Sequence, residues 1–261
     1  MNYFVEGLQG SGKSTLVQRL SEKNAGSTAI REGEYSPVEL AWCAYVDKQI
    51  FGNILEKYSN LADEIRSKSY EEDGKVVICY TKIAAEDRHF YEDLEQYEIY
   101  NGRLGMDEFS KIVLGRYKKW NSDNCIFECS LLQNTIEDMT LFRCAGDEEI
   151  ISFYGFVREA LEGKDYRILY LKAGDVEGNL ITIRKERSDE NGKESWFPLM
   201  MDYFNRSPYA KANNLQGEEA LIEHFKHRQA LELRILQKVF PDKYVVLESK
   251  KYTEQDFISA I

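Results

Sequence analysis

The feature that most constrains this chain lies near its start, where residues 7–14 read Gly-Leu-Gln-Gly-Ser-Gly-Lys-Ser. These residues fill every fixed position of the phosphate-binding loop pattern Gly-x-x-x-x-Gly-Lys-Ser/Thr. The apolar residues 3–5 before the loop indicate a short buried strand, and apolar residues recur at helical spacing from Leu16 to Leu20. A strand, a glycine-rich loop and a helix in that order predict a site for a nucleoside triphosphate.

The loop residues indicate how such a site would work. Glycines let the backbone N–H groups converge on phosphate oxygens, and the N-terminus of the following helix adds partial positive charge. Lys13 would reach the outer phosphates, and the Ser14 hydroxyl would coordinate magnesium. We therefore expect ATP and Mg²⁺ to be bound by Gly7, Gly10, Ser11, Gly12, Lys13, Ser14 and Thr15.

Four further apolar segments predict strands, with helical spacing between them. They are residues 27–31, 125–130, 167–172 and 244–247. Strands that alternate with helices pair in parallel, and helices cover both faces of their sheet. The sequence thus predicts a three-layer α/β fold built on a five-stranded parallel sheet.

The helical pattern predicts helices at about residues 53–69, 107–120, 131–142, 147–161, 196–205 and 217–240. Ser36-Pro37-Val38-Glu39 resembles a capping box with proline at the first helical position, and it predicts another helix through residue 46. Residues 75–83 look extended, and residues 84–105 are only weakly helical in pattern.

Composition restricts the partners of the chain. The formal net charge of −11 argues against nucleic acid and against anionic membranes, because both are bound by basic surface. The chain has no apolar run near the length of about 20 residues that spans a bilayer. Its first three residues lead into the first strand without a charged and apolar leader, so we expect a cytoplasmic protein.

The five cysteines are expected to be free thiols, because their number is odd and no leader precedes the chain. Cys125 and Cys129 would make half of a zinc site only with His224 and His227, which are far away in the sequence. We expect both cysteines to lie in the core and both histidines to be solvated.

Acidic residues follow two of the predicted strands, at the edge where parallel sheets bind ligands. Glu32 and Glu34 follow the second strand, and Glu128 ends the third. We predict that Glu32 orients or deprotonates an acceptor hydroxyl and that Glu128 holds magnesium. The alternative is that these residues, Glu34 above all, are ordinary loop carboxylates.

A basic stretch, Arg184-Lys185-Glu186-Arg187, precedes an acidic break that contains glycine. Arg184 and Arg187 could belong to a lid of about residues 184–210 and stabilise the charge of a phosphoryl group during transfer. The alternative is a solvated helix face on which Glu186 and Glu190 pair with the arginines. Arg88 and His89 are further candidates for contact with the acceptor.

Residues 4–16 resemble the opening of the thymidylate kinase and deoxynucleoside kinase superfamily, in which a Glu-Gly pair also precedes the loop. Arg31-Glu32 resembles the Arg-Glu-Pro of thymidylate kinases, and residues 127–130 resemble the Glu-Arg-Ser of deoxynucleoside kinases. Residues 169–172, followed by Arg184 and Arg187, are similar to the fourth strand and the arginine-bearing lid helix of that family. The resemblance implies the strand order 2-3-1-4-5 and a catalytic role for Glu32.

The chain departs from the family at two matched positions. Gly33 stands where the family has proline, and Cys129 stands where it has a phosphate-binding arginine. Residues 75–105, where the acceptor would be chosen, match nothing in the family.

Two functions are compatible with these patterns. The first is a kinase that moves the γ-phosphoryl group of ATP to a small acceptor, a nucleoside or nucleotide, with Lys13, Glu32, Glu128, Arg184 and Arg187 as catalytic residues. The second is a nucleotide-gated binding protein that hydrolyses ATP slowly and docks a protein partner. In both, residues 1–261 form one domain with an acceptor-side insertion at about residues 70–105, and apolar helices could also pair across a homodimer.

Overall fold

The computed structural model describes residues 1–261, which form two compact units. The first unit comprises residues 1–29 and 121–261, and the second comprises residues 30–120. The insertion of about residues 70–105 expected from the sequence lies within the second unit.

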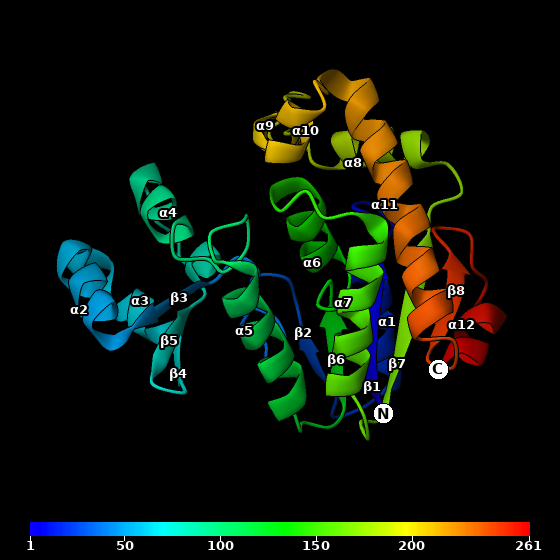
Figure 1. Cartoon of the computed structure of the whole chain (residues 1–261), viewed down its shortest axis with the longest axis horizontal. Coiled ribbons are helices and arrows are strands. Elements are labelled where there is room, and N and C mark those ends of the chain that lie inside the picture. The colour runs from blue at the N-terminus through cyan, green and yellow to red at the C-terminus, as the bar shows by residue number, and fades with distance from the viewer. The chain divides into compact units, whose positions relative to one another are not determined.

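The first unit is built on a five-stranded sheet whose order along the sheet is β2-β6-β1-β7-β8 (Figure 1). Its strands are β1 (Asn2–Gly7), β2 (Thr28–Ile30), β6 (Cys125–Glu128), β7 (Tyr166–Lys172) and β8 (Tyr244–Glu248). β1 pairs in parallel with β6 and β7, and β7 pairs in parallel with β8. Numbered within this sheet alone, the order is 2-3-1-4-5, so both the predicted strands and their predicted order are confirmed.

Helices cover both faces of this sheet. They are α1 (Lys13–Lys23), α6 (Gln133–Glu137), the π-helical turn η3 (Asp138–Phe142), α7 (Asp147–Ala160), α8 (Val176–Glu186), α9 (Trp196–Arg206), α10 (Pro208–Ala212), α11 (Gly217–Val239) and α12 (Glu254–Ala260). Leu169 and Leu171 of β7 pack in one core cluster with Leu16 of α1, whereas Tyr170 hydrogen-bonds to Glu232 of α11. Because successive side chains of a strand point to opposite faces, α1 and α11 lie on opposite sides of the sheet.

The second unit contains a smaller antiparallel sheet of order β3-β5-β4, which the sequence did not predict. The strands are β3 (Ala44–Asp47), β4 (Ser69–Glu72) and β5 (Lys75–Ile78). Asp73 and Gly74 join β4 to β5 with φ angles of 49° and 79°. Two positive φ angles are typical of the tight turn of a two-residue hairpin.

Helices α2 (Lys48–Lys57), α3 (Ala62–Ser67), α4 (Arg88–Glu95) and α5 (Met106–Lys119) complete the second unit, with short 3₁₀ turns η1 (Ser59–Leu61) and η2 (Tyr80–Lys82). Ile54, Ile65, Val76 and Phe90 lie in the core that joins α2, α3, β5 and α4. The single helix predicted at 53–69 is thus two helices with a turn between them.

The helix predicted from Ser36 is wrong. The Ser36 hydroxyl does accept the N–H groups of Val38 and Glu39, both at 3.3 Å, as an N-cap would. The Glu39 carboxylate, however, accepts the N–H of Ala41 at 2.6 Å instead of returning to Ser36. The segment continues without a helix and ends in β3, whose residues Ala44–Asp47 pair with β5.

None of the helices is both long enough and apolar enough to cross a lipid bilayer.

Candidate functional site

The glycine-rich loop connects β1 to α1, the position that the sequence predicted for it. Gly7 has a φ of +138°, and a Cβ there would lie 2.5 Å from the carbonyl oxygen of Leu171. Gly10 has a φ of +76°, and its Cβ would lie 2.8 Å from Cβ of Ile183 in α8. Both positions therefore require glycine, for backbone conformation and for space.

Lys13 is the first residue of α1, and its side chain folds back over the loop. Its Nζ donates hydrogen bonds to the carbonyl oxygens of Gly7 at 2.8 Å and Leu8 at 2.9 Å. A third bond of 3.2 Å goes to Oε1 of Gln133. The ammonium group is thus placed directly at the loop, and Gln133 is a contact that the sequence analysis missed.

Ser14 and Glu128 meet beside the loop. The Ser14 hydroxyl donates to Oε1 of Glu128 at 2.5 Å. The pairing of β1 with β6 sets this contact, because it aligns Val5 with Glu128 and brings the end of β6 to the start of the loop. A hydroxyl and a carboxylate are oxygen ligands of the kind that Mg²⁺ takes together with phosphate oxygens and water.

The rest of the loop fits a polyphosphate. Asn179 of α8 donates to the carbonyl of Gln9 at 2.6 Å, and Ser249 donates to the carbonyl of Ser11 at 2.8 Å. These bonds occupy the carbonyl oxygens of Gln9 and Ser11, whereas the first N–H groups of α1 have no acceptor within the helix. The Ser11 hydroxyl is buried without a hydrogen-bond partner in the protein. Donors without acceptors at a helix N-terminus are what a phosphate group requires.

Glu6 supports the segment that carries Gln133. It is fully buried in β1, and its carboxylate accepts the N–H groups of Leu131 at 2.7 Å and Gln133 at 3.4 Å. Burial raises its pKa to about 7, although the hydrogen bond from Leu131 acts in the opposite direction. The glutamate that precedes the loop therefore helps to hold the chain that follows β6.

A buried arginine on α11 reaches the same loop. Arg228 has no exposed side-chain surface, and its Nη2 donates to Oε1 of Gln9 at 2.6 Å. It also forms ion pairs with Glu137 and Glu232. Burial alone would raise the pKa of Glu137, but the charge of Arg228, together with its hydrogen bond and that of His224, outweighs burial and holds that pKa at about 2.

His224 corrects one prediction, because it is buried and not solvated. Its Nε2 lies 2.7 Å from Oε2 of Glu137. His227 is half exposed and lies 2.9 Å from Asp147. The core position expected for Cys125 and Cys129 is confirmed, and all five cysteines are free thiols.

Arg184 and Arg187 contact residues near the predicted lid. Arg184 pairs with Glu194 at 2.9 Å and with Glu218 at 2.6 Å, and it stacks 3.8 Å above the ring of Phe197. The hydrogen bond to Glu194 raises its pKa. Arg187 lies 5.0 Å from the ring centre of Trp196. The acidic partners of Arg184 are therefore Glu194 and Glu218, and not Glu186 and Glu190, which the alternative interpretation named.

Glu32, the predicted acceptor-side carboxylate, lies in the second unit. Its Oε1 accepts the indole N–H of Trp42 at 2.9 Å. Trp42 is exposed and has a φ of 64°. Nearby Glu39 is buried, and burial raises its pKa to about 8 although Tyr100 and the N–H of Ala41 bind its charged form. Glu34 accepts the N–H of Arg31 at 2.8 Å, the local contact of a loop carboxylate.

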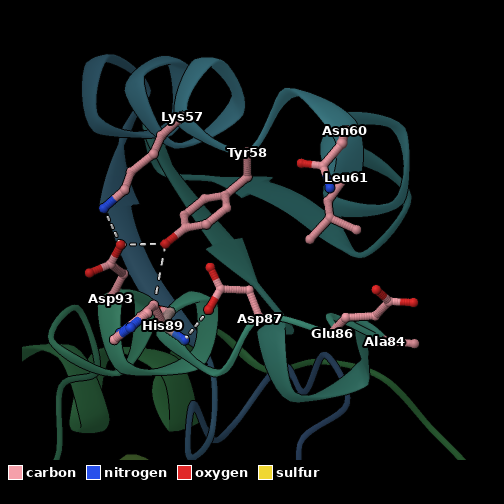
Figure 2. Close-up of a pocket in the computed structure, with 9 residues that line it drawn as sticks. All are labelled: Lys57, Tyr58, Asn60, Leu61, Ala84, Glu86, Asp87, His89 and Asp93. Carbon is pink, nitrogen blue, oxygen red and sulfur yellow. Dashed lines mark hydrogen bonds and ion pairs between the residues drawn. The ribbon is translucent and has the colours of Figure 1, made fainter.

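A hollow of about 910 Å³ opens in the second unit between η1 and the start of α4 (Figure 2). Tyr58 and Leu61 form one wall, and Asp87, His89 and Asp93 face them from α4 and its N-cap. The Tyr58 hydroxyl bonds to Asp93, which also pairs with Lys57. His89 thus lines a pocket, but Glu32 is not among the residues around it.

The sheet order and the loop together define the class of this protein. It has a P-loop α/β fold, the fold of nucleoside-triphosphate-binding proteins. No protein-family model matches the chain, and no curated protein sequence does. Among solved structures it is similar to a deoxyadenosine kinase from M. mycoides with bound dATP. The two share 15% sequence identity over 99% of this chain and 96% of that one, with a TM-score of 0.42.

Proposed function

We propose that this protein is a kinase that transfers the γ-phosphoryl group of ATP to a nucleoside or nucleotide. The observation that carries the proposal is the Ser14–Glu128 pair, 2.5 Å apart, beside a loop that also holds the ammonium group of Lys13. The three side chains supply the cation and the oxygen ligands that phosphoryl transfer uses. The loop by itself supports only nucleotide binding. The Glu128 carboxylate at the end of the neighbouring strand supports phosphoryl transfer as well.

Each residue has a stated task in this mechanism. Lys13 would exchange its bonds to the Gly7 and Leu8 carbonyls for bonds to the outer phosphates. Ser14 and Glu128 would hold Mg²⁺, which neutralises charge on the phosphates. Glu32 would orient the acceptor hydroxyl, or accept its proton.

Arg184 and Arg187 would stabilise the moving phosphoryl group. For Arg184 this requires release from Glu194 and Glu218, its partners in this structure. Both pairs are partly exposed, and such pairs typically contribute only about 0–1 kcal/mol, so phosphate can displace them.

The test is an untargeted search for the product. The protein is incubated with Mg·ATP and a pooled metabolite extract, and newly phosphorylated species are followed by mass spectrometry, with Lys13→Ala protein as the blank. Glu128→Gln should lose the product, whereas Glu248→Gln, at the end of β8, should retain it. No product from protein that binds ATP tightly would refute the kinase.

One observation favours a second function, a nucleotide-gated binding protein. Cys129, at the position of the family's phosphate-binding arginine, is buried, and its thiol donates to Gln133 at 3.7 Å. A kinase would therefore lack one positive charge near the phosphates. The rate of ATP consumption separates the two functions: a kinase consumes ATP faster when its acceptor is added, and a binding protein does not.

A further inference from the structure

Two thiols of the second unit lie in contact. Cys43 immediately precedes β3 and Cys79 immediately follows β5, and their sulfur atoms are 3.7 Å apart. The antiparallel register pairs Ala44 with Ile78, so one further step places Cys43 opposite Cys79. Opposite residues of antiparallel strands have Cα atoms about 4.5–5.5 Å apart, within the range of about 4.4–6.8 Å seen in disulfides. A bond between them therefore requires no rearrangement of the strands.

The environment of the pair favours reaction at one sulfur. The Cys43 thiol donates a hydrogen bond to the sulfur of Cys79, and this bond lowers the pKa of Cys79. Burial and the charge of Glu34 oppose the shift, while the charges of Lys82 and Lys68 support it. Cys43 is completely buried, and Cys79 is 2% exposed. Only a small reagent can reach such a pair.

The pair also lies next to the segment that carries Glu32. The Cys43 thiol contacts the carbonyl oxygen of Gly33 at 3.9 Å, and Gly33 follows Glu32 in the chain. Trp42, which precedes Cys43, donates to Glu32, and the hydroxyl of Thr81 donates to the carbonyl of Trp42 at 3.4 Å. The two cysteines are thus connected to Glu32 through adjacent residues, Gly33 on one side and Trp42 on the other.

We propose that Cys43 and Cys79 are a redox modification site, at which a hydroperoxide forms a reversible disulfide beneath the Glu32–Trp42 segment. The Cys79 thiolate attacks one peroxide oxygen, the O–O bond breaks, and hydroxide leaves with a proton from solvent. The resulting sulfenic acid is attacked by the sulfur of Cys43, and water leaves as the S–S bond forms. Two thiols and one hydrogen peroxide give one disulfide and two water molecules.

The disulfide changes the contacts of Cys43 with the segment that carries Glu32 and Gly33 in two ways. The sulfur atoms approach from 3.7 Å to about 2.05 Å. Cys43 also loses its one thiol proton, so its sulfur can no longer donate to the carbonyl oxygen of Gly33. An effect on catalysis rests on the proposed function of Glu32, whereas disulfide formation does not.

Peptide mapping of native protein tests the site directly. The protein is treated with hydrogen peroxide, blocked with iodoacetamide and digested with trypsin. Cys43 then lies in the peptide 32–48 and Cys79 in the peptide 76–82. We expect these two peptides to become linked in most molecules and to separate with dithiothreitol. Cys144→Ser, which removes the exposed thiol, should not change the linkage.

Two results would overturn the proposal. One is oxidation of Cys144 with peptides 32–48 and 76–82 still unlinked. The other is linkage that appears only in denaturant. If the kinase is also active, peroxide should lower turnover severalfold in the wild type and not in Cys79→Ala. Linked peptides with unchanged turnover would confirm the site and remove only its effect on Glu32; if Cys79→Ala fails to fold, the wild-type mapping still decides.

Discussion

The two units differ in how their characteristic residues are positioned, as the glycines of the first unit and the buried acids of the second unit show. In the first unit, the residue types of the loop from Gly7 to Ser14 follow a fixed sequence pattern, and the distant residues Leu171 and Ile183 leave room only for glycine at two of its positions. In the second unit, buried Glu39 and Glu98 have raised pKa values, about 8 and about 7, because burial disfavours their charge. The comparison teaches that the nucleotide site can be recognised from a local motif, whereas the buried acids of the second unit become apparent only once folding has brought side chains together.

The largest expected effect tests the local motif. Lys13→Ala should weaken ATP binding about 100-fold, because it removes charge-assisted bonds worth about 3 kcal/mol. Isothermal titration calorimetry measures the affinity, and Lys23→Ala, an exposed residue at the end of the same helix, is the control. Equal affinity of Lys13→Ala and wild type would contradict the assignment of the loop.

The next effect is the pH dependence of stability, which should have opposite signs for a buried acid of each unit. Glu39 has an unfolded pKa near 4.5 and a folded pKa of about 8, so the folded state retains a proton that the unfolded state has lost. Its contribution to stability is full below pH 4.5 and is lost as the pH rises through 8. In the wild type, Glu39 should lower the free energy of unfolding by on the order of 3 kcal/mol between pH 5 and pH 8, and Glu39→Gln should remove this decrease.

Glu137 of the first unit should behave in the opposite way. Its folded pKa of about 2 lies below the unfolded value, so its contribution is present above pH 4.5 and is lost as the pH falls toward 2. Urea unfolding of Glu39→Gln and Glu137→Gln across this pH range measures both signs, with exposed Glu71→Gln as the control. If both substitutions changed the pH dependence of the free energy of unfolding in the same direction, the comparison would be contradicted.

A smaller effect tests whether the local loop also depends on a distant residue. Gln9→Leu removes the oxygen that accepts from Arg228 and should weaken ATP binding about 10-fold. Arg228→Lys retains the charge but not the planar fork, so it should add little to Gln9→Leu in the double variant. The control is Gln229, which lies on the same helix as Arg228 and makes two buried hydrogen bonds to the backbone of Ala173. Gln229→Leu breaks both bonds and should lower stability without changing ATP affinity. Additive effects of the Gln9 and Arg228 changes would show that the contact has no role in binding.

The smallest effect concerns the hairpin of the second unit. Gly74 has a φ of +79°, but a Cβ there would meet nothing within 4 Å. Gly74→Ala should therefore cost only about 1 kcal/mol, from backbone strain alone. Thermal unfolding measures it, and Gly52→Ala, in helix α2 with equally open space, should be neutral or stabilising. A loss as large as several kcal/mol would mean that the turn is more constrained than its surroundings indicate.

Much of the first unit was predictable. Its strands are short apolar runs, and parallel pairing follows from the helices between them. The position of Lys13 and Ser14 followed from the loop pattern, and the adjacency of Glu128 followed from its place at a strand end. Each of these inferences uses residues that are close in sequence or a rule about how strands are ordered.

The second unit was predicted less well. The stretch from Val38 to Val46 was assigned to a helix because Ser36 and Pro37 carry the signal of a helix start. Ser36 does cap a turn, but the burial of Glu39 turns its carboxylate toward Ala41 and the helix does not begin. Pairing of β3 with β5, which joins residues from 28 (Asp47 with Lys75) to 34 (Ala44 with Ile78) positions apart, then decides the outcome.

The amino-acid sequence by itself determined the phosphate-binding loop, because glycine, lysine and serine at fixed spacing specify a backbone and its charge. It also determined the parallel sheet, because alternating strands and helices leave few other solutions. Only the tertiary structure decided that Gln133 meets Lys13, that Arg228 reaches Gln9, and that Cys43 lies against Cys79. These partners are between 36 and 219 residues apart, and no local pattern encodes such a contact. Packing brings them together, because buried polar groups must find partners wherever the fold supplies them.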